Sequence, residues 1–231
     1  HAPPAAWQHT GWRRRDQPNQ DKEMEPPRLT RTVQPDALSR RERYQLMTSL
    51  VIPRPIGWIS TVSSAGVRNL APYSFFNALS ASPPMVGVSI GVRAGEPKDT
   101  LVNIRETLAF AVNICSEELL EAMNASSAEL GPSVDEFEVA GLTAEAGEAT
   151  TAPVVGEAPA VLECELVKEV ELGEAANVLV IGEVKAVRLS EDLVIEPGTW
   201  AVDPRSLKAV GRLGADQYSF LRDIVKLPRP R

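Results

Sequence analysis

The sequence predicts a mainly β domain, an antiparallel barrel of strands with flanking helices. Several segments rich in β-branched residues are separated by turn signals, with few helices between them. Residues 162–172 alternate apolar and acidic side chains, and residues 177–189 form the predicted partner strand across Gly-Glu-Ala-Ala. The Gly-rich phosphate loops of dinucleotide- and triphosphate-binding folds are absent. These observations favour an antiparallel barrel over a doubly wound parallel sheet.

The chain is expected to consist of a polar lead and one domain. Residues 1–35 are rich in Pro, Gln and Arg without periodicity, which predicts a disordered N-terminal extension. Residues 36–231 are predicted to form a single domain. It opens with a helix, because Ser39 and Glu42 match a capping box, and this helix is expected to end near Ser49. Three of its apolar side chains lie on one side: Tyr44, Met47 and Val51.

A run of strands follows the Pro-Arg-Pro break at 53–55. Strands are predicted at 56–62, 67–73, 74–80 and 85–92, divided by the turn signals Ser-Ser-Ala-Gly and Ser-Pro-Pro. Trp58 is expected to be core. A helix then begins near Lys98, with Asp99 or Thr100 as the predicted cap, and three residues form its buried stripe: Leu101, Ile104 and Leu108. A strand is predicted at 108–115.

The second half is predicted to contain two helices, a loop and the long hairpin. Residues 117–130 have the pattern of an amphipathic helix, a short helical piece surrounds Phe137, and residues 141–158 resemble a loop. In the strand that follows, alternation places one set of side chains inward: Leu162, Cys164, Leu166, Val170 and Leu172. The other set forms a predicted solvated acidic face: Glu163, Glu165, Glu169 and Glu171.

Charge and cysteine content limit the environment and the partners. Residues 1–43 hold nine basic and six acidic residues, net +3, whereas the remaining 188 hold fifteen and twenty-five, net −10. An acidic body without a basic stripe argues against nucleic acid and anionic membranes, and no apolar run is long enough to span a bilayer. Cys115 and Cys164 lie in apolar runs and are expected to be buried thiols, which favours the reducing cytoplasm.

The body of the chain contains no histidine. The two histidines, His1 and His9, lie in the polar lead. A Ser-His-Asp or Cys-His nucleophile and a histidine-dependent metal site are therefore not expected. If the protein is an enzyme, we expect a cofactor to carry the chemistry, with no metal and no assigned catalytic side chain.

Lys98 stands where a helix already supplies partial positive charge. A lysine, a cap hydroxyl and free backbone N–H groups together suit an anion, especially a phosphate. On this stretch alone, a solvated lysine beside a capped helix is the favoured interpretation.

Two linked blocks, PRPIGWISTVSSAGVRNLAPYSFFNALSASPPMV (53–86) and KDTLVNIRET (98–107), carry a family resemblance. With EFEVAGLT (136–143) and APAVLECEL (158–166), the sequence resembles the flavin reductase-like, FMN-binding split-barrel family of the flavoredoxin type, from about Tyr44 to Tyr218. The resemblance implies an antiparallel barrel of about six strands and a homodimer with FMN in a groove at the subunit interface.

Matching positions imply the cofactor-binding residues. The resemblance assigns six residues to the FMN phosphate: Arg54, Ser60, Thr61, Lys98, Asp99 and Thr100. It assigns six to the isoalloxazine: Pro55, Ile56, Ser74, Phe75, Phe76 and Asn77. Because side chains alternate along a strand, at least one of Phe75 and Phe76 is expected to pack elsewhere. Arg212 and Tyr218, in GRLGADQY, are further candidates at the cofactor edge.

The implied function is that of an FMN-binding flavin reductase. Such an NAD(P)H:flavin oxidoreductase transfers a hydride from NADH or NADPH to flavin and passes the electrons to oxygen, free flavin or a partner monooxygenase. Two alternatives stay open: a flavoredoxin-like FMN electron carrier that does not oxidise NAD(P)H directly, and a non-catalytic flavin-binding module.

Overall fold

The computed structural model describes residues 30–173 and 177–230. Residues 1–29, most of the predicted extension, and residues 174–176, in the predicted Gly-Glu-Ala-Ala turn, lie outside the described residues. The chain forms two units, His1–Leu38 and Ser39–Arg231. The described part of the first contains a short 3-10 helix, η1 (Pro35–Ala37).

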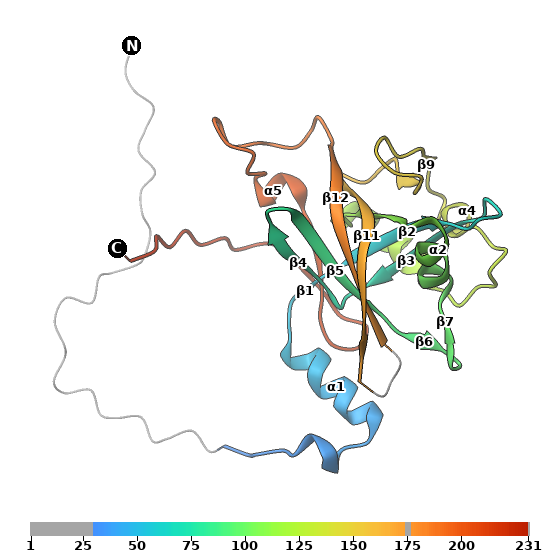
Figure 1. Ribbon diagram of the computed structural model, residues 1–231. Helices are drawn as coiled ribbons and strands as arrows, with labels where there is room; N and C mark the ends of the chain where they lie inside the picture. The colour runs from blue at the N-terminus through green and yellow to red at the C-terminus, as the bar shows by residue number, and fades with distance from the viewer. Residues whose placement is uncertain (1–29, 174–176, 231) are drawn as a thin grey trace, which may run out of the picture. The chain divides into compact units, whose positions relative to one another are not determined.

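Seven strands form one antiparallel sheet in the order β3-β2-β8-β11-β12-β5-β4. Their bounds are β2 Gly57–Val62, β3 Arg68–Tyr73, β4 Phe76–Ala81, β5 Pro84–Ile90, β8 Ala109–Asn113, β11 Ala160–Leu172 and β12 Asn177–Leu189. Strands β3 and β4 stand at opposite edges, yet only Ser74 and Phe75 separate them along the chain, so the sheet must curl back on itself. Figure 1 shows β11 and β12 running side by side through this sheet. The predicted mainly β, antiparallel fold is confirmed, with seven strands in the sheet instead of about six.

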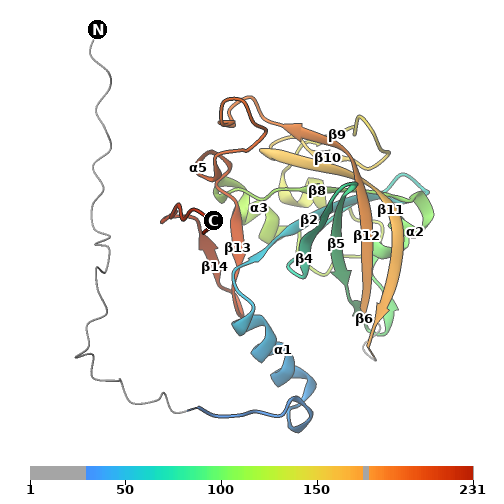
Figure 2. The ribbon, with the colours of Figure 1, turned by 60° about the vertical axis from the view of Figure 1, so that its left-hand side comes forward.

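Short strands complete the unit. Three small sheets contain β1 (Arg54–Pro55), β13 (Val210–Arg212) and β14 (Tyr218–Phe220); β6 (Val92–Arg93) and β7 (Glu96–Pro97); and β9 (Ala144–Glu145) and β10 (Val154–Val155). The first of these lies beside the barrel in Figure 2, and its register places Arg54 opposite Arg212. The β9–β10 pair lies within residues 141–158, so that segment is not a loop throughout.

The helices are short; α1 precedes the first strand and the others lie between strands. They are α1 (Arg40–Leu50), α2 (Asp99–Thr107), the 3-10 helix η2 (Glu117–Leu119), α3 (Leu120–Ala125), α4 (Glu136–Ala140) and α5 (Pro204–Leu207). The capping box of Ser39 and Glu42 on α1 is confirmed, and so is the helical piece around Phe137. The helix predicted over 117–130 is wrong in its length, because α3 ends at Ala125. No helix of the described ranges is long and apolar enough to cross a membrane.

Helix α2 differs from the prediction at both ends. Lys98 is its N-cap and makes no side-chain capping bond, so neither Asp99 nor Thr100 caps the helix. Leu101 and Ile104 are buried as expected, but Leu108 is 55% exposed. Leu108 is the C-cap and adopts the left-handed conformation at φ 58°, which turns its side chain out of the stripe.

Two apolar clusters pack against opposite faces of the sheet. One joins Ile59, Phe110 and other strand residues to Leu101 and Ile104 of α2. The other lies towards α3 and α4 and contains Trp58, which is fully buried as predicted. Cys115 and Cys164 are buried free thiols, as expected, one in each cluster.

The predicted acidic face of β11 is wrong at Glu163. This side chain is only 1% exposed, and its carboxylate accepts hydrogen bonds from the backbone N–H groups of Glu148, Ala149 and Thr150. The register shifts between Glu163 and Cys164 and again between Leu166 and Lys168. The alternation is kept at this point, because Glu163 pairs with Ala111 of one cluster and Cys164 pairs with Phe110 of the other. Glu163 is buried because the backbone of residues 148–150 covers its side of the sheet.

Candidate functional site

A groove of about 460 Å³ opens on the Ser39–Arg231 unit, at the junction of α1, the β3–β4 connection and the start of α2. Tyr44 and Phe75 supply its aromatic surface; both rings are more than 40% exposed, and their centroids lie 6.4 Å apart. Polar groups border the rest, among them Ser74, Lys98 and Asn177. The groove thus combines a flat apolar wall with a polar, cationic end.

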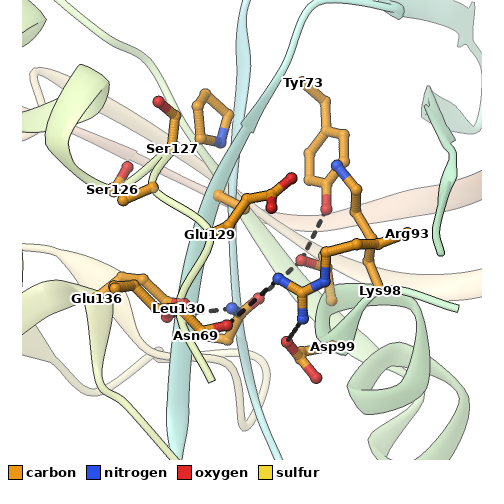
Figure 3. Close-up of a pocket in the computed structure, with 14 residues that line it drawn as sticks. Asn69, Tyr73, Arg93, Lys98, Asp99, Ser126, Ser127, Glu129, Leu130 and Glu136 are labelled. Carbon is orange, nitrogen blue, oxygen red and sulfur yellow. Dashed lines mark hydrogen bonds and ion pairs between the residues drawn. The ribbon is translucent and has the colours of Figure 1, made fainter. Parts of the chain in front are cut away.

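A smaller depression of about 130 Å³ adjoins the groove (Figure 3). Both are lined by Pro72, Tyr73 and Lys98, so these residues mark the junction. The lining of the smaller depression is mostly polar and comes from β3, β6, α2, α4 and the segment after α3: Asn69, Arg93, Asp99, Thr100, Ser126, Ser127, Glu129 and Glu136.

Lys98 provides a cation at this junction. Its Nζ lies 5.4 Å from the centroid of the Tyr73 ring, within the range of a cation–π contact. Among the described residues, no carboxylate lies within 4.0 Å of this ammonium group, whereas the neighbouring Asp99 pairs with Arg93 at 3.4 Å. The backbone N–H groups of Asp99 and Thr100 donate to no acceptor within residues 30–173 and 177–230. A lysine and a helix N-terminus therefore face the same space, which suits an anion.

A chain of buried hydrogen bonds lies beneath Lys98. The Tyr73 hydroxyl donates to Thr100 Oγ1 at 2.9 Å, and the Thr100 hydroxyl donates to Asn69 Oδ1 at 2.7 Å. Asn69 Nδ2 in turn donates to Glu136 Oε2 at 3.1 Å. Burial raises the pKa of Tyr73 to about 12, so its hydroxyl stays a donor at neutral pH. The network fixes the position of the Tyr73 ring, over which Lys98 lies.

Arg54 is placed away from this depression. Its guanidinium is buried and donates to the carbonyls of Thr48, Val51 and Leu213 and to Ser74 Oγ, at 2.6–3.3 Å. Burial lowers the pKa of Arg54. The guanidinium also lies 6.0 Å from the Phe75 ring. In this structure Arg54 thus ties α1 and the β13–β14 hairpin to the wall of the groove.

Ser60 and Thr61 are also turned inward. Both are fully buried: Ser60 donates to the Pro153 carbonyl at 2.5 Å, and Thr61 accepts from Asn103 Nδ2 at 3.0 Å. Of the six residues predicted to surround a phosphate, the structure brings together Lys98, Asp99 and Thr100 around the smaller depression.

The residues predicted to line a flavin ring are divided between two places. Ser74 and Phe75 border the groove. Pro55, Ile56 and Phe76 border a separate, mainly apolar depression of about 250 Å³. Phe76 also packs so closely on Gly57 that a Cβ there would lie 2.8 Å from its ring, so Phe75 and Phe76 border different depressions. Asn77 is exposed and accepts from the backbone N–H of Ala78.

Arg212 and Tyr218 pair with each other on neighbouring strands. The Arg212 guanidinium lies 4.5 Å from the centroid of the Tyr218 ring and donates to the Tyr218 hydroxyl. Neither residue lines the groove or the smaller depression.

Several lining residues were missed in the sequence. Arg93, Asn177, Ser126, Ser127 and Glu136 come from segments far apart in the chain, so no local spacing connects them. Tyr44 had a signal, because it lies on the apolar side predicted for the first helix.

Comparison with known proteins identifies the class. Residues 47–204 match the family model described as the flavin reductase like domain. The match covers more than half of the chain, and the protein therefore belongs to the flavin reductase-like family.

Solved structures agree with this assignment. Nitrilotriacetate monooxygenase component B from Bacillus cereus is 34% identical with a TM-score of 0.83, covering 87% of this chain and 100% of that one. The 2-nitrobenzoate 2-nitroreductase NbaA of Pseudomonas fluorescens is 30% identical with a TM-score of 0.79, covering 87% and 96%. A Shewanella frigidimarina protein described as a flavin reductase with a split barrel domain is 26% identical with a TM-score of 0.74, covering 85% and 96%. The fold is thus the flavin reductase-like split barrel.

Proposed function

We propose that the protein binds FMN in the groove and acts as an NAD(P)H:flavin oxidoreductase, supplying electrons to a partner monooxygenase. The observation that carries this proposal is Lys98, a cation without an ion-pair partner among the described residues, at the junction of an aromatic groove and a polar depression. Membership of the flavin reductase-like family supports it, as does the likeness to a monooxygenase component B.

The described residues fit FMN at both ends. A phosphate dianion needs positive charge and convergent N–H donors, and Lys98 with the N–H groups of Asp99 and Thr100 supplies both. The isoalloxazine is flat and mostly apolar with polar edges, which matches Tyr44, Phe75 and the hydroxyl of Ser74. When bound, FMN would take a hydride from a dihydronicotinamide and release two electrons to an acceptor.

The protein's own task in this chemistry is to bind and orient. Lys98 and the start of α2 hold the phosphate and thereby fix the register of the cofactor along the groove. Arg54, anchored by three carbonyls, holds Ser74 and Phe75 in place, so the ring meets a rigid wall. Orientation of this kind contributes to rate without a titrating side chain.

We further propose that a second copy of the chain covers the groove. Helix α1 and its C-terminal flank expose Tyr44, Met47, Leu50, Val51 and Ile52, each more than 45% exposed, next to the open side of the groove. Contiguous exposed apolar side chains of this kind mark an interface. A homodimer would bury them and exclude water from the flavin.

An anaerobic titration tests the reductase activity. Protein loaded with FMN is mixed with NADH or NADPH in the absence of oxygen, and the visible flavin absorbance is followed. We expect one of the two nucleotides to bleach it. If neither nucleotide does, while dithionite does, the protein is an electron carrier or a flavin-binding module instead of a reductase.

A further inference from the structure

Glu136 is a buried carboxylate beside the proposed phosphate subsite. It is the first residue of α4, is 7% exposed and lines the smaller depression. Its Oε2 accepts from the Leu70 backbone N–H and from Asn69 Nδ2, each at 3.1 Å. Among the described residues, no lysine or arginine lies within 4.0 Å of it, because the nearby Arg68 pairs with Asp135 and Glu138. Burying a carboxylate whose hydrogen-bond donors are all neutral lowers the stability of the fold. A residue kept at such a cost in stability is a candidate for a functional role.

The carboxylate determines the direction of the hydrogen bonds beneath Lys98. An ionised carboxylate only accepts, so Asn69 must turn its Nδ2 towards Glu136. The Asn69 Oδ1 then faces Thr100 and accepts from its hydroxyl, which leaves Thr100 to accept from Tyr73. Without Glu136, the Asn69 amide could turn over and reverse each of these bonds.

This chain of hydrogen bonds connects the three elements that meet at the subsite. Glu136 belongs to α4, Asn69 and Tyr73 to β3, and Thr100 to the first turn of α2. Lys98 lies over the Tyr73 ring, as Figure 3 shows, and Thr100 lines the depression. Reversal would leave the buried Tyr73 hydroxyl hydrogen without its acceptor and loosen the groups that face the anion.

We propose that Glu136 is a positioning residue of the flavin phosphate subsite, acting through Asn69 and Thr100 on Tyr73 and Lys98. The role rests on the proposed binding of FMN at this site. The role predicts that replacing Glu136 weakens binding of the phosphate and changes the affinity for the flavin ring very little.

Binding of FMN and of riboflavin, which lacks the phosphate, separates this role from general damage. Glu136→Ala is expected to weaken FMN at least tenfold and to leave riboflavin within twofold. Glu136→Gln, whose amide oxygen can accept both N–H groups, is expected to restore FMN to within about threefold of wild type. The matched control is Glu138→Ala. Glu138 lies two residues further along α4 with an exposed side chain, and its loss should change the affinity for neither FMN nor riboflavin. Unchanged FMN affinity in Glu136→Ala, or an equal loss of both ligands, overturns the proposal.

A second variant removes the hydrogen bond between Asn69 and Glu136 at the Asn69 end. Asn69→Asp keeps the shape of the residue but removes the N–H donors, and it should weaken FMN as much as Glu136→Ala does. If Glu136→Ala fails to fold, Asn69→Asp and Glu136→Gln decide the question: wild-type FMN affinity in Asn69→Asp contradicts the proposal.

Hydrogen exchange at the Asn69 side-chain amide tests the positioning without flavin. We expect protection in wild type and in Glu136→Gln, and exchange at least tenfold faster in Glu136→Ala. Equal exchange in all three overturns the positioning role. A wild-type protein that binds FMN no better than riboflavin would instead refute the phosphate subsite and the proposed function, and the exchange result would still decide the role of Glu136.

Discussion

Glu163 shows how a single residue can depart from the pattern of its strand. Its carboxylate accepts hydrogen bonds from three consecutive backbone N–H groups of residues 148–150. These bonds hold the loop that contains residues 148–150 against β11. Burial alone would raise the pKa of Glu163, but the bonds from Glu148, Ala149 and Thr150 lower it, and the net pKa lies below its ordinary value.

Replacing Glu163 should destabilise the domain in a pH-dependent way. Because the pKa is lower in the folded state, the carboxylate stabilises the fold above its ordinary pKa, and this stabilisation is lost as the pH falls through the folded value. We expect Glu163→Gln to lower the free energy of unfolding at neutral pH by about 1–3 kcal/mol. The difference from wild type should narrow in acid, as measured by urea unfolding across pH.

The matched control is Glu165→Gln on the same strand. Glu165 is about half exposed and pairs with Lys185 at 3.3 Å, so its loss should cost less than about 1 kcal/mol. Equal effects of the two substitutions, or a Glu163→Gln deficit that is independent of pH, would contradict this account.

At the scale of the element, α2 depends on two buried residues and ends in a left-handed cap. Leu101→Ala should lower the free energy of unfolding by about 2–5 kcal/mol, because it removes a buried side chain from the cluster between α2 and the sheet. Leu108→Gly should not destabilise and is expected to gain up to about 1 kcal/mol, since glycine adopts φ 58° without strain. Thermal or urea unfolding measures both; a loss above about 1 kcal/mol in Leu108→Gly would contradict the cap assignment.

Local patterns predicted most elements but not their interruptions. The capping box at Ser39 and the alternation in 162–172 are local signals, so the first helix and the first strand of the long hairpin followed from them. Residues 148–150 cover Glu163, and Leu108 takes a left-handed conformation at the end of α2, so a regular period predicted neither the burial of Glu163 nor the exposure of Leu108.

The same distinction applies to the site. Lys98 and Thr100 both line the smaller depression. The start of a helix is a local signal that drew attention to Lys98, and the family resemblance assigned both residues to a phosphate. The bonds of Arg54 were not predictable from spacing, because its acceptors lie between 3 and 159 residues away. Glu136 and Asn69 meet only through the packing of α4 on β3.

At the scale of the whole molecule, the apolar surface of α1 predicts association. We expect light scattering to give twice the mass of one chain for wild type. Leu50→Glu places a charge in the middle of the exposed apolar surface, and it should shift the protein to monomers and weaken FMN binding together. A monomeric wild type that still holds one FMN per chain would contradict the dimer.

The central claim is that Lys98 and the start of α2 bind the phosphate of FMN. The most direct test is the dissociation constants of FMN and riboflavin for wild type, Lys98→Ala and the control Lys168→Ala, an exposed lysine on β11. The account predicts that Lys98→Ala weakens FMN by about 1–3 kcal/mol, leaves riboflavin unchanged and thereby removes most of the preference for FMN. An unchanged FMN dissociation constant in Lys98→Ala would contradict it.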